Sequence, residues 1–307
     1  MRFSLKESWS FLKEMFQAYS DDDCFTLGAA LSYYTVFSLA PILIIIIALV
    51  GFIFGPDAVR GEIYHQLDGL LGPENAAQIQ SLVRNAYQSQ SGIVATVIGI
   101  ITLVFGATGV FTQLKKSLNI VWQMKAEAKS GILRFALDRL VSFAMVVAIG
   151  FVLLVALVVE ALAASLSDYL EQLIPAFSGP LVVTVNFAIT LVLTSLIFAC
   201  IYKFLPDAKV RWSDVMVGSL VTSLLFALGR LGIGLYLSKS NVGETFGAAG
   251  FLVVLLTWVY YSSQILFLGA EFTYVYARRY GSGIQPSANA VKVERNEVEV
   301  PDESPQA

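Results

Sequence analysis

The residues best placed to do chemistry are ionisable side chains within long apolar segments. Arg230 and Glu160 lie inside two such segments, and Glu271 lies near the end of another. A charge at the centre of a bilayer costs about 2.5–3.5 kcal/mol on insertion scales, so each one is a candidate functional residue with a partner to be found. Counted from the start of two helices that run the same way, Arg230 and Glu160 differ in depth by roughly 4–5 Å. We therefore predict an intramembrane ion pair, with Arg230 as an anchor for a phosphate-bearing ligand.

Other polar residues recur on single helical faces in the later apolar segments. Asn186 begins one such face, and Tyr261, Gln264 and Glu271 share another. Two explanations stay open: the faces line a pathway for a substrate, or they join helices through hydrogen bonds worth around 0.6 kcal/mol each. Pro41 removes a hydrogen bond from the first long apolar segment, which predicts either a hinge or a simple bend.

Metal and redox chemistry have little material to work with. The chain has one histidine, His65, and two cysteines, Cys24 and Cys200, too few for a Cys/His zinc site or a disulfide framework. Asp21–Asp23 precede the first apolar segment, where carboxylates suit a helix N-terminus better than a metal. The sequence has no Walker A motif. We expect no cofactor and no enzymatic activity.

Composition places these residues in a membrane protein. Hydrophobic residues make up 56% of the 307 positions and charged residues 14%, against roughly 25% charged in soluble chains. A net charge of −3 gives no reason to expect a nucleic-acid partner. About 20 apolar residues span a bilayer as a helix. We predict an all-α polytopic membrane protein with six transmembrane helices, at 31–55, 92–111, 140–164, 181–204, 213–237 and 250–274.

The basic residues predict the orientation. Sixteen of the 20 Lys and Arg residues fall in the two terminal segments and in the loops after the second and fourth apolar segments. Because cytoplasmic loops carry this excess, both termini are predicted to be cytoplasmic. An even number of spans requires the same result.

Three segments lie outside the predicted spans. Residues 1–23 carry an amphipathic pattern that predicts a helix lying on the inner membrane surface or packed on the bundle. Residues 56–91 predict an external helical hairpin between the first two spans, which rests on lipid, caps the bundle or serves packing alone. The transmembrane domain is expected to cover 24–280, and residues 281–307 predict a disordered cytoplasmic tail.

Several segments resemble the YihY/BrkB family of bacterial inner-membrane proteins over about 25–280. They are Ala29–Tyr34 with Phe37–Pro41, Gly109–Phe111 with Leu118, Asn119 and Trp122, Leu205–Asp207 with Trp212, and Gly247–Gly250 with Leu268–Glu271. Phe246 departs from the tyrosine expected before Gly247. The resemblance implies six spans, an inner-membrane location and a role in the cell envelope. It also implies relatives named for serum resistance and others once labelled ribonuclease.

Three classes of function follow. The leading hypothesis is a transporter or flippase for an amphiphilic or lipid-linked envelope component, driven by a gradient or a partner. The second is a scaffold that organises envelope assembly without transport. A nuclease is disfavoured, because phosphodiester cleavage usually needs clustered carboxylates or histidines that hold metal ions. The expected partners are membrane lipids, an anionic amphiphile as substrate, and an oligomer or a partner protein.

Overall fold

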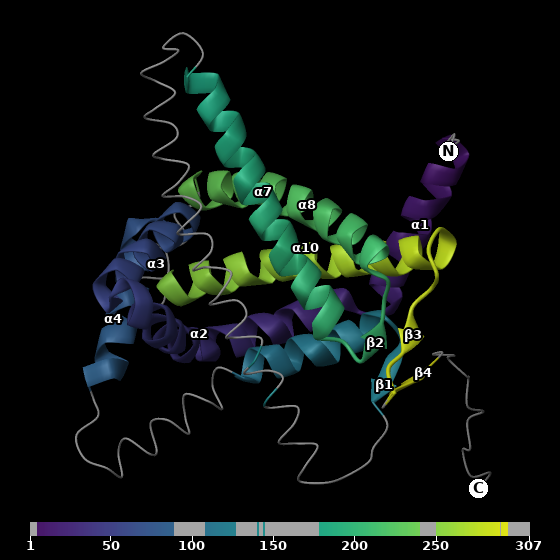
Figure 1. Cartoon of the computed structure of the whole chain (residues 1–307), viewed down its shortest axis with the longest axis horizontal. Coiled ribbons are helices and arrows are strands. Elements are labelled where there is room, and N and C mark those ends of the chain that lie inside the picture. The colour runs from purple at the N-terminus through teal and green to yellow at the C-terminus, as the bar shows by residue number, and fades with distance from the viewer. Residues whose placement is uncertain are drawn as a thin grey trace, which may run out of the picture.

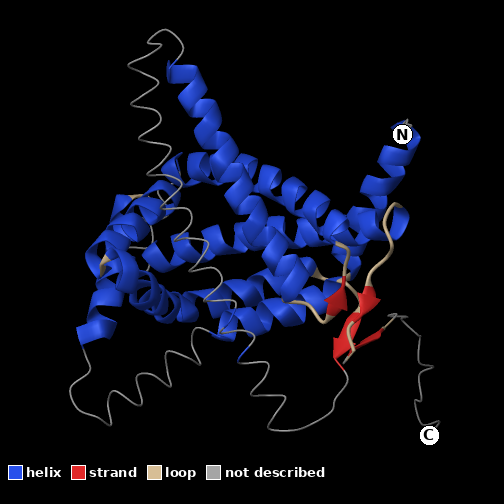
Figure 2. Cartoon of the chain, in the orientation of Figure 1, coloured by secondary structure: helices blue, strands red, loops and turns tan. Residues whose placement is uncertain are grey.

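The structure is a computed structural model that describes residues 5–88, 108–126, 140, 144, 178–239, 250–288 and 290–293. In these ranges the chain is mainly helical, as predicted (Figures 1 and 2). The helices are α1 (Leu5–Asp21), α2 (Cys24–Phe54), α3 (Pro56–Leu71), α4 (Pro73–Gln88), α7 (Ser178–Phe204), α8 (Trp212–Lys239) and α10 (Gly250–Arg279), with a further helical segment at 108–121. The short strands are β1 (Met124–Ala126), β2 (Ala208–Lys209), β3 (Gln285–Pro286) and β4 (Ala290–Lys292).

Four helices of the described chain are long and apolar enough to cross a membrane. Their candidate spans are Cys24–Ile47, Phe187–Phe204, Trp212–Gly234 and Gly250–Arg279. The predicted second and third spans, 92–111 and 140–164, lie largely outside the described residues. On α8, Leu220, Leu224, Leu228 and Leu231 are exposed, at the spacing of one helical face. A lipid-facing surface requires such a face, since lipid tails are as apolar as leucine.

The central helix of the bundle is α10, which contacts α8, α2 and α1 (Figure 1). Glycines allow the close approach of α10 to α8. A Cβ on Gly269 of α10 would lie 1.9 Å from Thr222 Oγ1, and a Cβ on Gly218 of α8 would lie 1.9 Å from Thr273 Oγ1. No side chain fits at either glycine unless a helix moves, so small residues determine this packing.

A second apolar cluster lies at the start of α10, where α2, α3 and α4 meet. Ile79 and Val83 of α4 are buried with Leu43 and Ile47 of α2 and with Phe251 at the start of α10. Helices α3 and α4 begin at prolines and contact each other. The glycines before them, Gly55 and Gly72, have φ angles of 86° and 84°, which favour glycine. Two helices therefore occupy the region of the predicted hairpin.

Helix α1 packs on the bundle, which is one of its two predicted arrangements. Phe11, Met15 and Tyr19 are buried against the bundle. On another side Trp9 and Phe16 are exposed, at 71% and 56%. Contact of this aromatic face with the inner membrane surface stays a prediction.

The C-terminal segment differs from the predicted disordered tail in its first part. β4 pairs antiparallel with β1, and β3 pairs antiparallel with β2 (Figure 2). The backbone N–H groups of Ser287 and Val293 add bonds of 3.0 and 2.8 Å to the carbonyls of Asp207 and Gln123. Backbone pairing with two loops orders this segment, although it has too few apolar side chains to build a core.

Candidate functional site

Glu271 is the most deeply buried acidic residue of the described chain. It lies near the C-terminal end of α10 with 0% of its surface exposed. The thiol of Cys24, the first residue of α2, donates to Glu271 Oε1 over 3.8 Å. Oε2 has no hydrogen-bond donor among the described residues. A buried carboxyl group with so few donors is costly to keep charged.

A second acid lies beside this carboxyl group. Asp22, in the turn between α1 and α2, is 8% exposed and interacts with Glu271. Two carboxylates held close together repel each other, and protonation of either one relieves the repulsion.

Two helical turns before Glu271 in α10, Gln264 contacts α1 and α2. Its Oε1 accepts a hydrogen bond from the Tyr19 hydroxyl, and its Nε2 has no acceptor among the described residues. A Cβ on Gly28 would lie 2.0 Å from that Nε2, so a side chain at position 28 would displace the amide. Burial, followed by the nearby Cys24, raises the pKa of Tyr19. The phenol therefore remains a donor at neutral pH.

Aromatic donors fix the part of α10 that carries Glu271. The Tyr202 hydroxyl of α7 donates to the carbonyl of Leu266 at 2.7 Å and lies 3.1 Å from Thr222 Oγ1. The Trp122 indole donates to the carbonyl of Ala270 at 3.1 Å. These bonds hold the part of α10 that directly precedes Glu271, and Trp122 and Tyr202 are both wholly buried.

A polar clasp joins a helical segment and a loop at the same end of the bundle. Asn119 Nδ2 donates to Asp207 Oδ2 at 2.9 Å, and the Asp207 backbone N–H donates to Asn119 Oδ1 at 2.8 Å. Lys115 Nζ lies 3.0 Å from Asp207 Oδ1. The clasp thereby connects the segment at 108–121 to the loop between α7 and α8.

A surface pocket of about 290 Å³ lies beside Asp22. Asp21, Asp22, Gln123, Tyr274 and Arg278 are among the residues that line it. Asp22 thus belongs both to this pocket and to the buried pair, whereas Glu271 does not line the pocket. In the ranges that the structure describes, no group of three or more His, Cys, Asp or Glu residues is arranged to hold a metal ion.

The structure tests the remaining predicted site residues unevenly. Arg230 is exposed on α8, whereas Glu160 lies outside the described residues, so their ion pair stays a prediction. Tyr261 packs toward α8, where a Cβ on Gly229 would lie 3.1 Å from its hydroxyl. Asn186 lies in α7. Pro41 lies within α2, which continues to Phe54, and a hinge there stays a prediction.

The partners of Glu271 were missed by reasoning from the sequence. Asp22 was interpreted as suiting a helix N-terminus, and Cys24 was considered only as a possible metal ligand or disulfide partner. The one available signal was the resemblance itself, whose quoted residues Asn119, Asp207 and Glu271 all lie at this end of the bundle.

Comparison with known proteins identifies the family. The profile described as virulence factor BrkB matches residues 15–294. The chain belongs to this family. The match confirms the predicted resemblance and runs from α1 past β4, so the ordered C-terminal strands lie within the family region.

Individual relatives are distant. A UPF0761 membrane protein of Pseudoalteromonas atlantica is 27% identical over 85% of this chain and 84% of its own length. The ribonuclease-like protein YfkH of Bacillus subtilis is 25% identical over 88% of this chain and 96% of its own length. A UPF0761 membrane protein of Psychrobacter sp. is 26% identical over 87% of this chain, which spans 48% of that relative. No solved structure matches the chain significantly.

These findings establish a BrkB-family membrane protein. Its relatives are named as membrane proteins, and four of its described helices are apolar enough to span a bilayer. The acidic pair of Asp22 and Glu271, the Gln264 contacts and the Asn119–Asp207 clasp form the polar end of this BrkB-family bundle.

Proposed function

We propose that this BrkB-family protein transports an amphiphilic or lipid-linked envelope component across the bacterial inner membrane, coupled to proton movement through Glu271. The observation that carries the proposal is the complete burial of the Glu271 carboxyl group within a candidate membrane span, beside a second acid. Acidic residues inside membrane helices mark proton relays and ion pathways. A chain without a Walker A motif needs such a gradient or a partner to drive transport.

In this proposal the domain has six spans and cytoplasmic termini, with α3 and α4 as the external hairpin. The distribution of charge supports this orientation. Lys115, Lys209 and Arg278 lie at the end of the bundle that carries the strands, whereas Arg60 and Arg84 lie on α3 and α4 at the other end. The excess of basic residues at the strand end suits the cytoplasmic side.

A scaffold without transport is the second candidate. Several polar residues of α7 and α8 bond to each other: Ser195 Oγ and Ser219 Oγ lie 3.2 Å apart, and Tyr202 and Thr222 bond through their hydroxyl groups. Such contacts hold helices together without requiring movement. The proposal includes no nucleic-acid partner and no enzymatic step.

The test is lipid movement in proteoliposomes under an imposed pH gradient. Fluorescent phosphatidylglycerol is the probe, and its accessibility to dithionite reports the rate at which it crosses the bilayer. We expect the gradient to accelerate crossing by the wild type and to lose this effect in Glu271→Gln. Glu74→Gln, an exposed position on α4, is the matched control and should behave as the wild type.

Equal gradient dependence in the wild type and Glu271→Gln would refute coupling through Glu271. A wild type that moves no lipid under any gradient would favour the scaffold. Thermal unfolding of each purified variant separates loss of coupling from loss of fold.

A further inference from the structure

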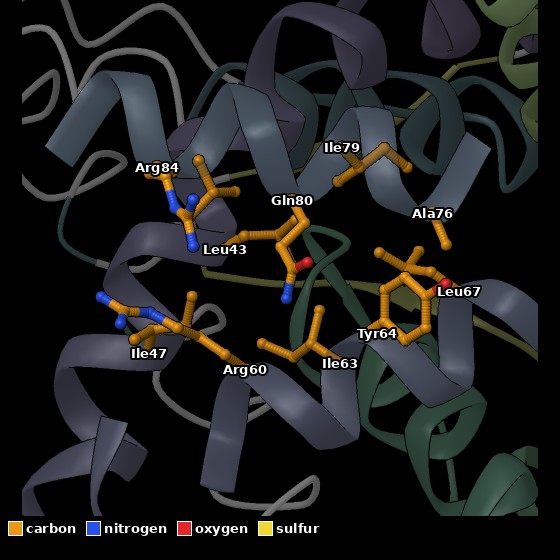
Figure 3. Close-up of a pocket in the computed structure, with 11 residues that line it drawn as sticks. Leu43, Ile47, Arg60, Ile63, Tyr64, Leu67, Ala76, Ile79, Gln80 and Arg84 are labelled. Carbon is orange, nitrogen blue, oxygen red and sulfur yellow. The ribbon is translucent and has the colours of Figure 1, made fainter. Parts of the chain in front are cut away.

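A second pocket lies at the opposite end of α10 from Glu271. It has a volume of about 290 Å³ and lies where α2, α3 and α4 meet (Figure 3). Leu43 and Ile47 of α2 and Ile79 and Val83 of α4 line its apolar part, and all four are buried. The pocket thus has an apolar wall at the end of the bundle away from the acidic pair.

The polar part of this pocket is positively charged. Arg60 comes from α3 and Arg84 from α4, and their guanidinium groups lie toward the same end of the pocket in Figure 3. Gln80, also from α4, points into the space between the two helices. The lining includes no acidic residue. An anion is therefore the complementary ligand.

One ion pair of Arg60 is exposed to solvent. Arg60 Nη1 lies 3.0 Å from Asp57 Oδ1, but the Asp57 side chain is 94% exposed. Solvent screens such a pair, so it contributes little and exchanges readily for a better anion. Guanidinium groups bind phosphate through paired N–H donors, which makes two arginines a suitable cradle for a phosphate.

The position of the apolar wall shows that the ligand also has an apolar part. Leu43 and Ile47 belong to α2 and lie within the candidate span Cys24–Ile47. Part of the wall therefore belongs to a membrane-spanning helix, and the arginines belong to the two helices that follow it. A molecule that matches both parts has an anionic head group and a hydrocarbon chain.

We propose that this pocket binds the phosphate head group of a membrane amphiphile, with Arg60 and Arg84 holding the phosphate and the α2–α4 wall holding the adjoining chain. Ligand pockets commonly measure about 300–1,000 Å³. This one suits a head group and the first part of a chain, while the rest of the chain remains in the bilayer. The site rests on the proposed function, for which it supplies the substrate class, and it is a second candidate phosphate anchor besides Arg230.

Native mass spectrometry of the full chain in neutral detergent tests the site, with dioleoyl phosphatidic acid as the probe. Arg60→Gln combined with Arg84→Gln should weaken binding of the first lipid by about tenfold or more, because each arginine supplies a charged hydrogen bond. Arg211→Gln, an exposed arginine at the other end of the bundle, should bind as the wild type. Dioleoyl phosphatidylcholine should bind more weakly than phosphatidic acid, and inorganic phosphate should not displace the lipid.

Three results would overturn the assignment. They are unchanged lipid binding by the double variant, equal binding of phosphatidylcholine, and displacement by inorganic phosphate at concentrations comparable with the lipid, which would indicate a site for a free anion. Because binding is measured without transport, the two proposals fail separately. A protein that binds phosphatidic acid through the arginines but moves no lipid retains the site and loses the transport function.

Discussion

Replacing Asp207 with alanine tests whether the polar clasp holds the bundle end together. The substitution removes the acceptor of the Asn119 Nδ2 bond at 2.9 Å and the partner of Lys115 at 3.0 Å. The Lys115 and Asp207 side chains are only 18% and 17% exposed, so solvent replaces these contacts incompletely. The backbone bond from Asp207 N–H to Asn119 remains available.

The expected loss follows from these contacts. A hydrogen bond to a charged group contributes about 1.5–3 kcal/mol, and removal of one partner of a half-buried ion pair adds to it. We expect Asp207→Ala to lower the free energy of unfolding by about 2–4 kcal/mol. Asp207→Asn retains a carbonyl acceptor for Asn119 and should lose about half as much.

The assay is reversible unfolding in mixed detergent micelles at pH 7, followed by tryptophan fluorescence. Asp57→Ala is the matched control, because its ion pair with Arg60 has the same length of 3.0 Å but an Asp side chain that is 94% exposed. We expect no measurable loss for the control. If Asp207→Ala were no less stable than Asp57→Ala, the clasp would contribute nothing and the argument from burial would be wrong.

Three other predictions concern packing, pH and topology. Gly269→Ala should destabilise the protein by about 2–4 kcal/mol in the same unfolding assay, because its Cβ would lie 1.9 Å from Thr222 Oγ1. The control Gly234→Ala, whose Cβ would have nothing within 4 Å, should be neutral or slightly stabilising. Equal effects of the two substitutions would contradict the close contact between α8 and α10. Burial raises the pKa of Tyr19, so the unfolded chain loses its phenol proton at a lower pH than the folded protein does. The free energy of unfolding should therefore fall as the pH rises above about 10, more steeply in the wild type than in Tyr19→Phe. Parallel pH profiles of the two proteins would exclude a contribution from Tyr19. In cells with a permeabilised outer barrier and a background without Cys24 and Cys200, His65→Cys should react with an impermeant maleimide and Lys209→Cys should not, and the reverse pattern would invert the topology.

Much of the architecture could be predicted from the sequence because it depends on local properties. The length and apolar character of α2, α7, α8 and α10 are visible in single segments, and the helical pattern of 56–91 follows from its periodicity. The strands were missed for the opposite reason. β2 and β3 have two residues each, too few to show alternation, and each pairs with a segment distant along the chain.

The sequence by itself determined the class of protein and its family, because hydropathy, charge bias and short motifs are carried by neighbouring residues. Only the tertiary structure decided which side chains meet. Glu271 stood out in the sequence as an ionisable residue, but its contact with Cys24 joins residues 247 positions apart, and the Asn119–Asp207 clasp joins residues 88 positions apart. Likewise, Arg60 and Arg84 line one pocket because α3 and α4 fold against each other at Gly72. No local pattern encodes such contacts, since they result from the packing of whole helices through glycines and buried polar groups.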